Sequence, residues 1–283
     1  QILAQKAGVT LKPFTPQEAA ERDEHENLRA LLEDAVTFYR HQLVNTESGR
    51  QALEYLRGRG LSDDTLEAFG IGYAPNRWDA LLQHFTAKGA DPQDLLQIGL
   101  LSEGQEGRLH DRFRHRVMIP IRDAQGRMAG FGARILDPND VPKFLNSPQT
   151  PLFDKGRLLY GLDSARRAIR EADQAVLVEG YLDVLALHQA GFTNVISPMG
   201  TALTEQQLFL LKRYTKRVVL ALDADAAGEK ATLRGLEVAR QAMDHSQELF
   251  FDSHGLLRFE ARLQADIRVA TLPAGLDPDE VVQ

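Results

Sequence analysis

The feature that most constrains the fold is a regular alternation of short apolar runs and helical segments after residue 174. Strands that alternate with helices imply crossover connections and a parallel sheet. The runs VLV and VVLAL are continuously apolar, which is typical of strands buried on both faces. We therefore expect an α/β fold in this part of the chain, with strands at 175–178, 195–197, 217–222 and 267–272 and helices at 181–190, 204–214 and 226–243.

Acidic residues follow three of these predicted strands. Glu179 comes directly after AVLV. Asp223 and Asp225 come directly after RVVLAL, and Asp277 and Asp279 come a few residues after RVATLP. Because ligands of open α/β sheets bind at the carboxyl ends of the strands, we expect these five carboxylates to face one crevice.

A crevice with so many carboxylates needs a cation. Two carboxylates about 4 Å apart repel each other by roughly 4 kcal/mol at an effective dielectric constant of about 20. With one or two Mg²⁺ ions, the same cluster would become a phosphoryl-transfer site. A single acid after a strand is more often the N-cap of the following helix, and Asp225 before AAGEKA could be only that. The pattern alone leaves both interpretations open.

The composition limits which metals are possible. The chain has no cysteine, and its eight histidines are scattered without an HxxxH pair. This excludes disulfides, thiol catalysis, and zinc or iron–sulfur sites built on cysteine. A metal held mainly by carboxylates is expected to be a hard cation such as Mg²⁺, Mn²⁺ or Ca²⁺. No apolar run reaches the roughly 18 residues of a membrane span, so we expect no membrane partner.

The middle of the chain has a different pattern. Residues 117–121 and 128–135 are predicted strands joined by a turn at 123–126, which makes them a hairpin. Gly130 and Gly132 lie inside the second strand, where glycine weakens a sheet. Two such glycines predict the close approach of another backbone or of a ligand.

The remaining segments are mainly helical. Pro and an absence of periodicity make residues 1–16 a predicted tether. Apolar residues at helical spacing predict helix over 17–57, ended by Gly58 and Gly60. Further helices are expected at 62–69, capped by Ser62, and at 78–85 and 162–172, and residues 244–264 are predicted to be an inserted hairpin.

Charge is distributed unevenly along the chain. The net charge is −7, but residues 107–170 carry thirteen Lys or Arg and six Asp or Glu, a local charge of +7 that leaves −14 elsewhere. A basic block beside an acidic one indicates a surface that recruits phosphates next to a cleft that needs cations. Arg112, Arg114 and Arg116 alternate and would project from one face of an extended segment. Charges that alternate along a strand more often mark only a solvated face.

The acidic segments resemble a known family. EGYLD at 179–183, DAD followed by AAG at 223–228, and DPDE at 277–280 are similar to the three acidic motifs of the Toprim domain, which DnaG-type primases and topoisomerases share. Ala224 stands where the second motif commonly has Gly, so that turn must avoid a positive φ.

The basic block narrows the resemblance to bacterial DnaG-type primases. RFRHRVMIPIRDAQGRMAGFGAR at 112–134 and PKFLNSPQTPLFDKGRLLYGL at 142–162 resemble their catalytic core nearly residue for residue. FYRHQL, YLRGRGLS and IGYAP, between 38 and 75, resemble the amino-terminal part of that core. Gln149 departs from the usual Glu and is assigned no catalytic role. The likeness covers roughly residues 30–240 and 266–283.

The resemblance implies an α/β protein with two parts. A mixed α+β, basic amino-terminal subdomain at 17–170 would precede a Toprim subdomain with a Rossmann-like parallel sheet at 171–283. The family's amino-terminal zinc-binding module and carboxy-terminal helicase-binding module are missing from the sequence. We therefore expect an excised polymerase core without zinc.

The implied activity is template-directed synthesis of short RNA primers on single-stranded DNA from NTPs, by divalent-metal-dependent nucleotidyl transfer. Glu179, Asp223 and Asp225 would be catalytic. One to three Mg²⁺ or Mn²⁺ ions would be held by Glu179, Asp223, Asp225, Asp277 and Asp279. Asp183 is expected to lock the strand–helix junction, with direct metal contact as the alternative, and Gly180 to let the chain turn sharply there.

Phosphate contacts are assigned to the basic block. Arg112, Arg114 and Arg116 would bind triphosphate and primer phosphates, since Arg suits bidentate contacts. Phe144 and Tyr160 could stack on bases or pack in the core, and Trp78 is interpreted as a packing residue. The other predicted contacts are Arg134, Lys143 and Lys155 along the template, and Asn146 and Ser147 with the nucleotide.

The expected partners are single-stranded DNA, NTPs and the RNA primer, with a replicative helicase and a single-stranded DNA-binding protein implied by the resemblance. The protein is expected to be a monomer in the bacterial cytoplasm, at the replication fork. Two other functions remain open. One is a Toprim topoisomerase or nuclease, and the other is a noncatalytic binding module in which the acids are only helix caps.

Overall fold

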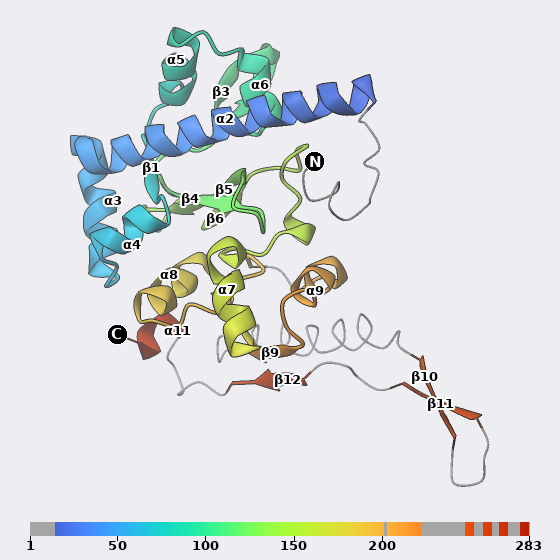
Figure 1. Ribbon diagram of the computed structural model, residues 1–283. Helices are drawn as coiled ribbons and strands as arrows, with labels where there is room; N and C mark the ends of the chain where they lie inside the picture. The colour runs from blue at the N-terminus through green and yellow to red at the C-terminus, as the bar shows by residue number, and fades with distance from the viewer. Residues whose placement is uncertain are drawn as a thin grey trace, which may run out of the picture.

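The molecule is built around two four-stranded sheets, one antiparallel and one parallel (Figure 1). In this computed structural model, the residues described are 15–200, 203–221, 247–251, 257–261, 266–270 and 278–282. For 247–251 and 257–261, as for Ala19 and Asp279, the description covers the backbone only. The predicted helix at 226–243 lies outside these residues.

The amino-terminal helix begins earlier than the sequence predicts. α2 (Pro16–Asn45) starts inside the expected tether, because Thr15 and Glu18 form a capping box in which Glu18 N donates to Thr15 Oγ1 at 3.2 Å. Pro16 at the first helical position has no N–H to satisfy, which favours a helix start there.

The prediction of one continuous helix to residue 57 is wrong. The chain breaks at Thr46, whose backbone is extended and whose hydroxyl accepts a hydrogen bond from Gly49 N at the start of α3 (Glu47–Gly58). Thr46 Oγ1 also donates to Gln42 O at 2.6 Å. A threonine that competes with the backbone in this way favours a cap over a helix interior.

The antiparallel sheet has the order β1-β4-β5-β6. The predicted hairpin is confirmed as β4 (Arg116–Arg122) and β5 (Met128–Ile135). Around the sheet lie β1 (Gly72–Ala74), β6 (Phe144–Asn146), α4 (Asp63–Ala68), which Ser62 caps as predicted, α5 (Ala80–Ala87), α6 (Pro92–Gln97), the short ribbon β2 (Leu101–Glu103) with β3 (Leu109–Asp111), and the 3₁₀ turns η1 (Gln105–Gly107) and η2 (Lys155–Arg157).

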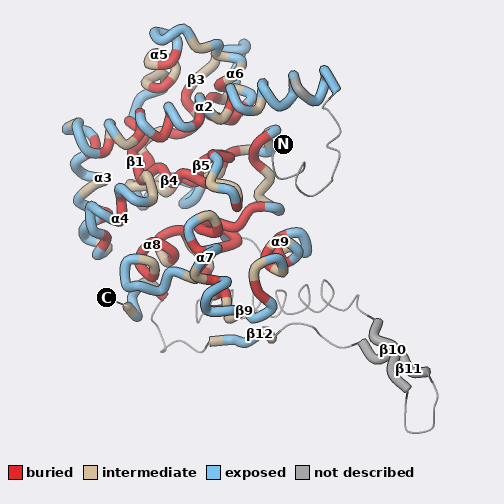
Figure 2. Tube along the Cα trace, in the orientation of Figure 1, coloured by how far each residue is buried: buried red, intermediate tan, exposed pale blue. Residues whose placement is uncertain are grey.

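Both faces of this sheet are covered, so β4 is buried along almost its whole length. Met118 packs in a cluster with residues of α2, whereas Val117 and Ile119 pack in a different cluster, with residues of α8 (Tyr181–Gln189). The two clusters take alternate residues, as the period of two in a strand requires. Figure 2 shows the buried residues concentrated along these strands and under the helices.

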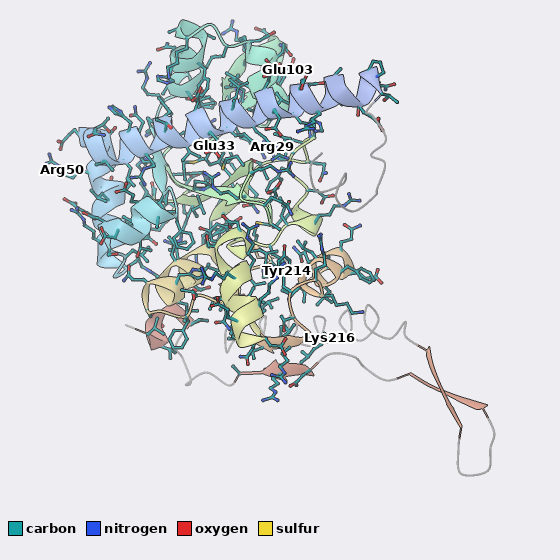
Figure 3. The ribbon with its side chains drawn as sticks, in the orientation of Figure 1. Arg29, Glu33, Arg50, Glu103, Tyr214 and Lys216 are labelled. Carbon is teal, nitrogen blue, oxygen red and sulfur yellow. The ribbon has the colours of Figure 1, made fainter. Side chains whose placement is uncertain are left out.

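Polar contacts tie α2 to the sheet that it covers. Arg29 Nη1 donates to Met128 O, and Glu33 pairs with Arg122 with an O···N distance of 2.9 Å. Figure 3 shows Arg29 and Glu33 on the side of α2 that faces the sheet.

The parallel sheet has the order β12-β9-β7-β8, and from β7 to β9 its strands and helices alternate as predicted. The helix predicted at 162–172 is α7, with the same bounds. The insertion at 244–264 contains the expected antiparallel pair. The elements are α7 (Leu162–Ala172), β7 (Ala175–Leu177), β8 (Val195–Ile196), α9 (Glu205–Leu211), β9 (Arg217–Leu220), β10 (Gln247–Phe251), β11 (Leu257–Ala261), β12 (Asp266–Val269) and α11 (Pro278–Val281).

Helices cover both faces of β7. Ala175 and Leu177 pack in a cluster that includes α7 and α9, while Val176 and Val178 contact the cluster that includes α8. β7 is therefore buried on both sides, and the chain that follows it meets the antiparallel sheet, where Tyr181 lies against Gly132. Within the described ranges, no helix has both the length and the apolar composition needed to cross a bilayer.

Candidate active site

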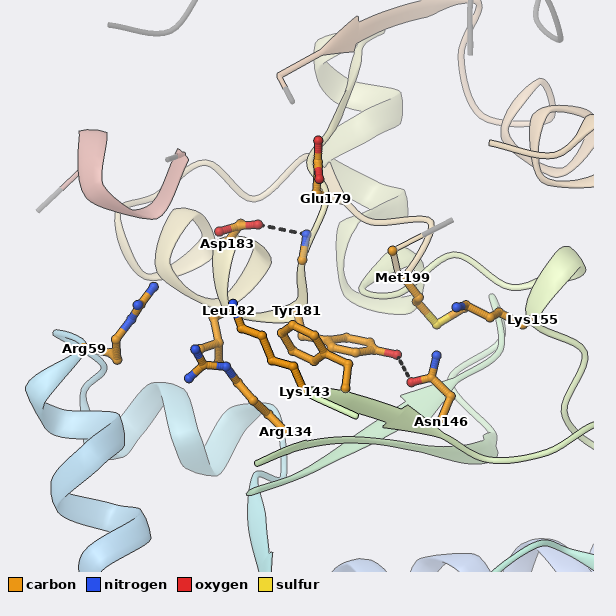
Figure 4. Close-up of a pocket in the computed structure, with 13 residues that line it drawn as sticks. Arg59, Arg134, Lys143, Asn146, Lys155, Glu179, Tyr181, Leu182, Asp183 and Met199 are labelled. Atoms are coloured by element: carbon orange, nitrogen blue, oxygen red, sulfur yellow. Dashed lines mark hydrogen bonds between the residues drawn. The ribbon is translucent and has the colours of Figure 1, made fainter. Parts of the chain in front are cut away.

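A cavity of about 380 Å³ lies at the carboxyl end of β7, between the two sheets (Figure 4). We call it the carboxylate pocket. Both halves of the molecule contribute to it, since β5, β6 and the turn after α3 form one wall and the start of α8 forms the other. Its lining consists of Arg59, Arg134, Lys143, Phe144, Asn146, Lys155, Glu179, Gly180, Tyr181, Leu182, Asp183, Met199 and Gly200.

Glu179 lies at the end of β7, where the sequence predicts it. Its backbone carbonyl accepts hydrogen bonds from Ser197 Oγ at 2.7 Å and from Gly200 N at 3.2 Å. Ser197 is fully buried, and its hydroxyl also accepts from Met199 N at 2.9 Å. The backbone that presents the Glu179 carboxylate to the pocket is therefore held by the end of the neighbouring strand.

Asp183 locks the start of α8, which confirms its predicted role. Its Oδ2 accepts a hydrogen bond from Gly180 N at 2.8 Å, as the dashed line in Figure 4 shows. Gly180 has a negative φ, so a left-handed turn is not the reason for glycine here. A Cβ at this position would lie only 2.8 Å from Asp183 Oδ2, so a side chain here would displace the carboxylate that caps α8.

The other predicted metal ligands belong to parts of the chain after β9. Asp223, Asp225 and Asp277 lie outside the described residues, and the side chain of Asp279 is not described. In the described part of the chain, no group of three or more His, Asp or Glu side chains is close enough to hold a metal. The five-carboxylate cluster therefore stays a prediction.

The backbone nevertheless fits that prediction. β7 and β9 are parallel, with Leu177 opposite Leu220, and Ala221 N donates to Leu177 O at 2.8 Å. The chain thus leaves β9 beside the place where Glu179 leaves β7, two residues before Asp223. Carboxylate oxygens are the donors that hard divalent cations prefer, so the residue types suit Mg²⁺ or Mn²⁺.

Basic side chains line the wall opposite the carboxylates. Lys143 and Lys155 come from the segments around β6 and η2, and burial lowers the pKa of Lys155. The Arg134 guanidinium lies over the Tyr55 ring, 4.9 Å from its centroid. The sequence assigns Arg134, Lys143 and Lys155 to the template, but the structure places all three in the same cavity as Glu179.

An aromatic contact joins the two walls. The Tyr181 hydroxyl donates to Asn146 Oδ1 at 2.6 Å, and burial raises the pKa of Tyr181. The Tyr181 ring lies against Gly132, where a Cβ would come within 2.6 Å of Tyr181 Cζ. This confirms the predicted close approach at Gly132. Phe144 is 41% exposed beside the ring and stays available for stacking, whereas Tyr160 is buried in the core.

A second cavity, of about 580 Å³, lies on the other side of the 141–146 segment. We call it the arginine pocket. The two cavities adjoin, because Arg112 lines this one and its Nη2 donates at 3.3 Å to the backbone carbonyl of Asn146. The lining consists of Asn76, Arg112, Arg114, His115, Arg116, Asp137, Asn139, Asp140, Val141, Pro142 and Leu145.

The three predicted arginines meet in this pocket, but not as the face of one strand. His115 has a φ of +51°, which interrupts the extended segment between Arg114 and Arg116. Arg116 is also buried, and it pairs with Asp140 at 3.1 Å and donates to Pro142 O at 2.8 Å. Its guanidinium is therefore used within the protein, which corrects its prediction as a phosphate contact.

Ser147 is a second correction. Its side chain is buried, and Phe131 N in β5 donates to Ser147 Oγ at 2.9 Å. The hydroxyl accepts the hydrogen bond of a β5 backbone N–H beside Gly130. It therefore does not face a nucleotide. The contact also explains that glycine, since a Cβ there would lie 2.8 Å from Ser147 Oγ.

Trp78 is not the packing residue that the sequence predicts. Its side chain is 63% exposed, and the Arg114 guanidinium carbon lies 3.9 Å from the ring centroid. An exposed Trp stacked with Arg beside a basic cavity is typical of a surface that binds unpaired bases. Residue type alone favours burial for Trp, so the sequence offered no signal of this exposure.

Arg59 is the basic residue of the carboxylate pocket that sequence reasoning missed. It lies in the turn that ends α3, between Gly58 and Gly60. Figure 4 shows its guanidinium reaching toward the side of the pocket where Asp183 lies. An arginine between two glycines after a helix indicates a tight surface turn, and that is the signal that could have singled it out.

Comparisons with known proteins agree with this arrangement. Residues 38–166 match the family described as DNA primase catalytic core, N-terminal domain, and residues 176–251 match a Toprim-like family. A DNA primase of Halalkalibacterium halodurans is 40% identical over 285 residues, which cover 100% of this chain and 44% of that protein. The chain thus spans less than half the length of this relative.

Solved structures agree over a larger share of their length. A DNA primase domain from Pseudomonas aeruginosa superposes with a TM-score of 0.78 and 39% identity, covering 90% of this chain and 74% of that one. A DnaG primase catalytic domain bound to single-stranded DNA gives a TM-score of 0.77 and 38% identity, covering 92% and 75%. The chain therefore belongs to the DnaG-type DNA primases, whose catalytic core it matches.

Proposed function

We propose that this chain catalyses template-directed RNA primer synthesis on single-stranded DNA, joining NTPs by divalent-metal-dependent nucleotidyl transfer. The observation that carries the proposal is the carboxylate pocket, which Glu179 at a strand end lines together with cations from four other segments. Lys143 and Lys155 suit the phosphates of a nucleotide, and Arg59 reaches toward the side of the pocket where Asp183 lies. Phosphoryl transfer depends mainly on such positioning and charge stabilisation.

The metal would be held at the carboxyl edge of the parallel sheet. Glu179 would share it with Asp223, Asp225 and Asp277, and Asp279 would be an outer ligand. Mg²⁺ or Mn²⁺ bound there would lower the pKa of the attacking hydroxyl and neutralise charge at the phosphorus. Glu179 would also accept the proton of that hydroxyl. Asp183 is committed to the α8 start and is not proposed as a ligand.

The two cavities would divide the substrates, in the reverse of the assignment that the sequence favours. Arg134, Lys143 and Lys155 would contact the nucleotide, because they share a cavity with Glu179. Arg112 and Arg114 would contact the template, because they line the adjoining arginine pocket.

The template contact combines charge with stacking. Exposed Trp78, stacked on Arg114, would accept an unpaired base, as stacking tolerates any base sequence. The similar catalytic domain that was solved with single-stranded DNA supports this choice of ligand. Binding should weaken steeply with salt, because each neutralised phosphate releases a counterion.

An extension assay tests the proposal. A short RNA annealed to a longer DNA template, with NTPs and Mg²⁺, should be lengthened by template-complementary nucleotides, and chelation should stop the reaction. Asp223→Asn and Asp225→Asn should abolish extension while single-stranded DNA still binds. Intact DNA binding without any extension by the wild-type chain would contradict the proposal and favour a binding module. Relaxation or nicking of supercoiled plasmid would instead favour a topoisomerase or nuclease.

The wider setting follows from the family. We propose that a replicative helicase and a single-stranded DNA-binding protein act with the complete protein at the replication fork, and that the catalytic core works as a monomer. Sedimentation of the chain with and without template DNA would test the last point.

A further inference from the structure

The segment that carries Trp78 has an unusual anchor. Trp78 lies two residues before α5, and its side chain is mostly exposed, so packing of the ring does not hold the segment in place. Asp79, at the N-cap position, accepts no hydrogen bond from a backbone N–H of the first turn. Its carboxylate instead contacts Arg77 and Gln83. The helix therefore has no local side-chain cap.

A distant carboxylate supplies the cap. Asp111, the last residue of β3, accepts hydrogen bonds from Leu81 N at 2.7 Å and from Leu82 N at 3.0 Å, one on each carboxylate oxygen. These are N–H groups of the first turn, which have no partner within a helix. Only 2% of Asp111 is exposed, so both bonds are shielded from water.

The backbone of Asp111 binds both members of the stack. Its N–H donates to Trp78 O at 2.7 Å, and its carbonyl accepts from Arg114 Nη1. One buried residue thus contacts the backbone of Trp78 and the side chain of Arg114. The carboxylate of Asp111 caps α5, and its backbone holds the backbone of Trp78 and the side chain of Arg114.

We propose that Asp111 is the positioning residue of the Trp78–Arg114 stack, and that the affinity of the arginine pocket for single-stranded DNA depends on its carboxylate. This rests on the proposed function, in which the stack binds template. Asp111 touches no substrate. It acts by holding the Trp78 ring and the Arg114 guanidinium in position against each other.

The chain contains a single tryptophan, so tryptophan fluorescence, excited where tyrosine does not absorb, reports on Trp78 alone. Asp111→Asn keeps the shape but leaves one oxygen to accept from two N–H groups. We expect the folded variant to shift the Trp78 emission spectrum and to bind an oligothymidylate about five- to ten-fold more weakly, as one lost buried hydrogen bond permits. Its affinity for a fluorescent GTP analogue with Mg²⁺ should not change.

A matched variant separates positioning from helix capping in general. Asp91 caps α6 in the same half of the molecule, with Gln93 N donating to Asp91 Oδ1 at 2.9 Å. Asp91→Ala should cost stability but leave both the Trp78 emission and the oligothymidylate affinity unchanged. Asp111→Glu, which keeps the charge and displaces it by one methylene, replaces the Asn variant if that one fails to fold. It should change the emission and the affinity in the same direction.

Arg114→Ala distinguishes the two proposals. If Arg114→Ala leaves oligothymidylate affinity unchanged, the assignment of the template to this pocket fails. If Arg114→Ala weakens binding while a folded Asp111 variant binds like the wild type, the positioning role is overturned. Combined with Arg114→Ala, the Asp111 variant should lose less than the product of the two single effects, because both act on one stack.

Discussion

The carboxylate pocket and the arginine pocket are both rich in cations, but they use their charges differently. In the arginine pocket, Arg116 is neutralised by Asp140, and Arg114 is stacked on Trp78. In the carboxylate pocket, neither Lys143 nor Lys155 pairs with a carboxylate of the described residues. A lysine without such a partner can bind a phosphate without first breaking an ion pair, whereas a stacked arginine offers a surface for bases.

The two pockets also differ in what builds them. The arginine pocket lies within the antiparallel half, whereas the carboxylate pocket exists only where the two halves meet. A basic surface can therefore be made by one sheet and its loops, but the reactive site needs both sheets. The following variants test how far this division holds.

The largest expected effect is on RNA extension, and it should differ between a carboxylate of the carboxylate pocket and one of the arginine pocket. Glu179→Gln is expected to reduce RNA extension by at least about 100-fold, because the amide can neither bind the metal equally well nor accept the proton. Asp140→Asn, in the arginine pocket, should reduce it only a few-fold. Extension rates at saturating NTP, with oligothymidylate affinity as the control, would measure the difference. Equal losses would mean that the pockets do not divide the work.

The stability of the protein should depend on pH through Asp111, which holds the Trp78–Arg114 stack. Burial raises the pKa of Asp111 to about 6, despite the opposing backbone hydrogen bonds. The unfolded chain releases this proton near its ordinary pKa, so the free energy of unfolding should fall as the pH rises from about 4 to about 6, by on the order of 3 kcal/mol.

Urea unfolding of the wild type and of Asp111→Asn across this pH range would measure that contribution. The difference between the two proteins isolates Asp111, since all other groups titrate in both. A difference that does not vary with pH, or that grows in favour of the wild type as the pH rises, would contradict the shift.

The stability of the protein should be sensitive to one added methyl group where Tyr181 packs against Gly132. Gly132→Ala would place a Cβ against the Tyr181 ring, and we expect it to destabilise the protein by about 2 kcal/mol. Gly58→Ala is the control, because a Cβ there meets no atom within 4 Å. Denaturation midpoints compare the two. Similar stabilities would show that Tyr181 can move without cost.

The smallest effect concerns the exposed aromatics. Trp78→Ala should weaken oligothymidylate binding about ten-fold, since base stacking contributes about 1 to 3 kcal/mol per base. Phe144→Ala should instead affect the KM for NTP, because Phe144 lies in the carboxylate pocket. Anisotropy of a labelled oligonucleotide and NTP titrations provide both readouts, and an exchange of the two effects would reverse the division of substrates.

The sequence predicted the elements better than the environment of their side chains. The strand at 128–135 and the helix at 162–172 have the predicted bounds, because periodicity and turn residues mark them clearly. The break at Thr46 was missed, since a threonine inside a periodic apolar pattern does not reveal that its hydroxyl caps the next helix.

The sequence predicted many of the residues that line the two pockets, but it did not predict which of them lie together. Clustering along the chain singled out Arg112 and Arg116 alike. However, Arg116 pairs with Asp140, which lies in a loop 24 residues further along the chain. Arg59 comes from a turn far upstream and was missed for the same reason. Contacts between distant segments decide which cation faces a ligand, and spacing along one segment carries no information about them.

The contact between Tyr181 and Gly132 has a mechanical consequence. The ring of one half fills the space that a missing side chain leaves in the other, and its hydroxyl is fastened to Asn146 on the same wall. A shearing movement of the two sheets would drive the ring into a backbone that has no room for it. The pocket should therefore be preformed and rigid, so that substrates bind without the two sheets closing around them.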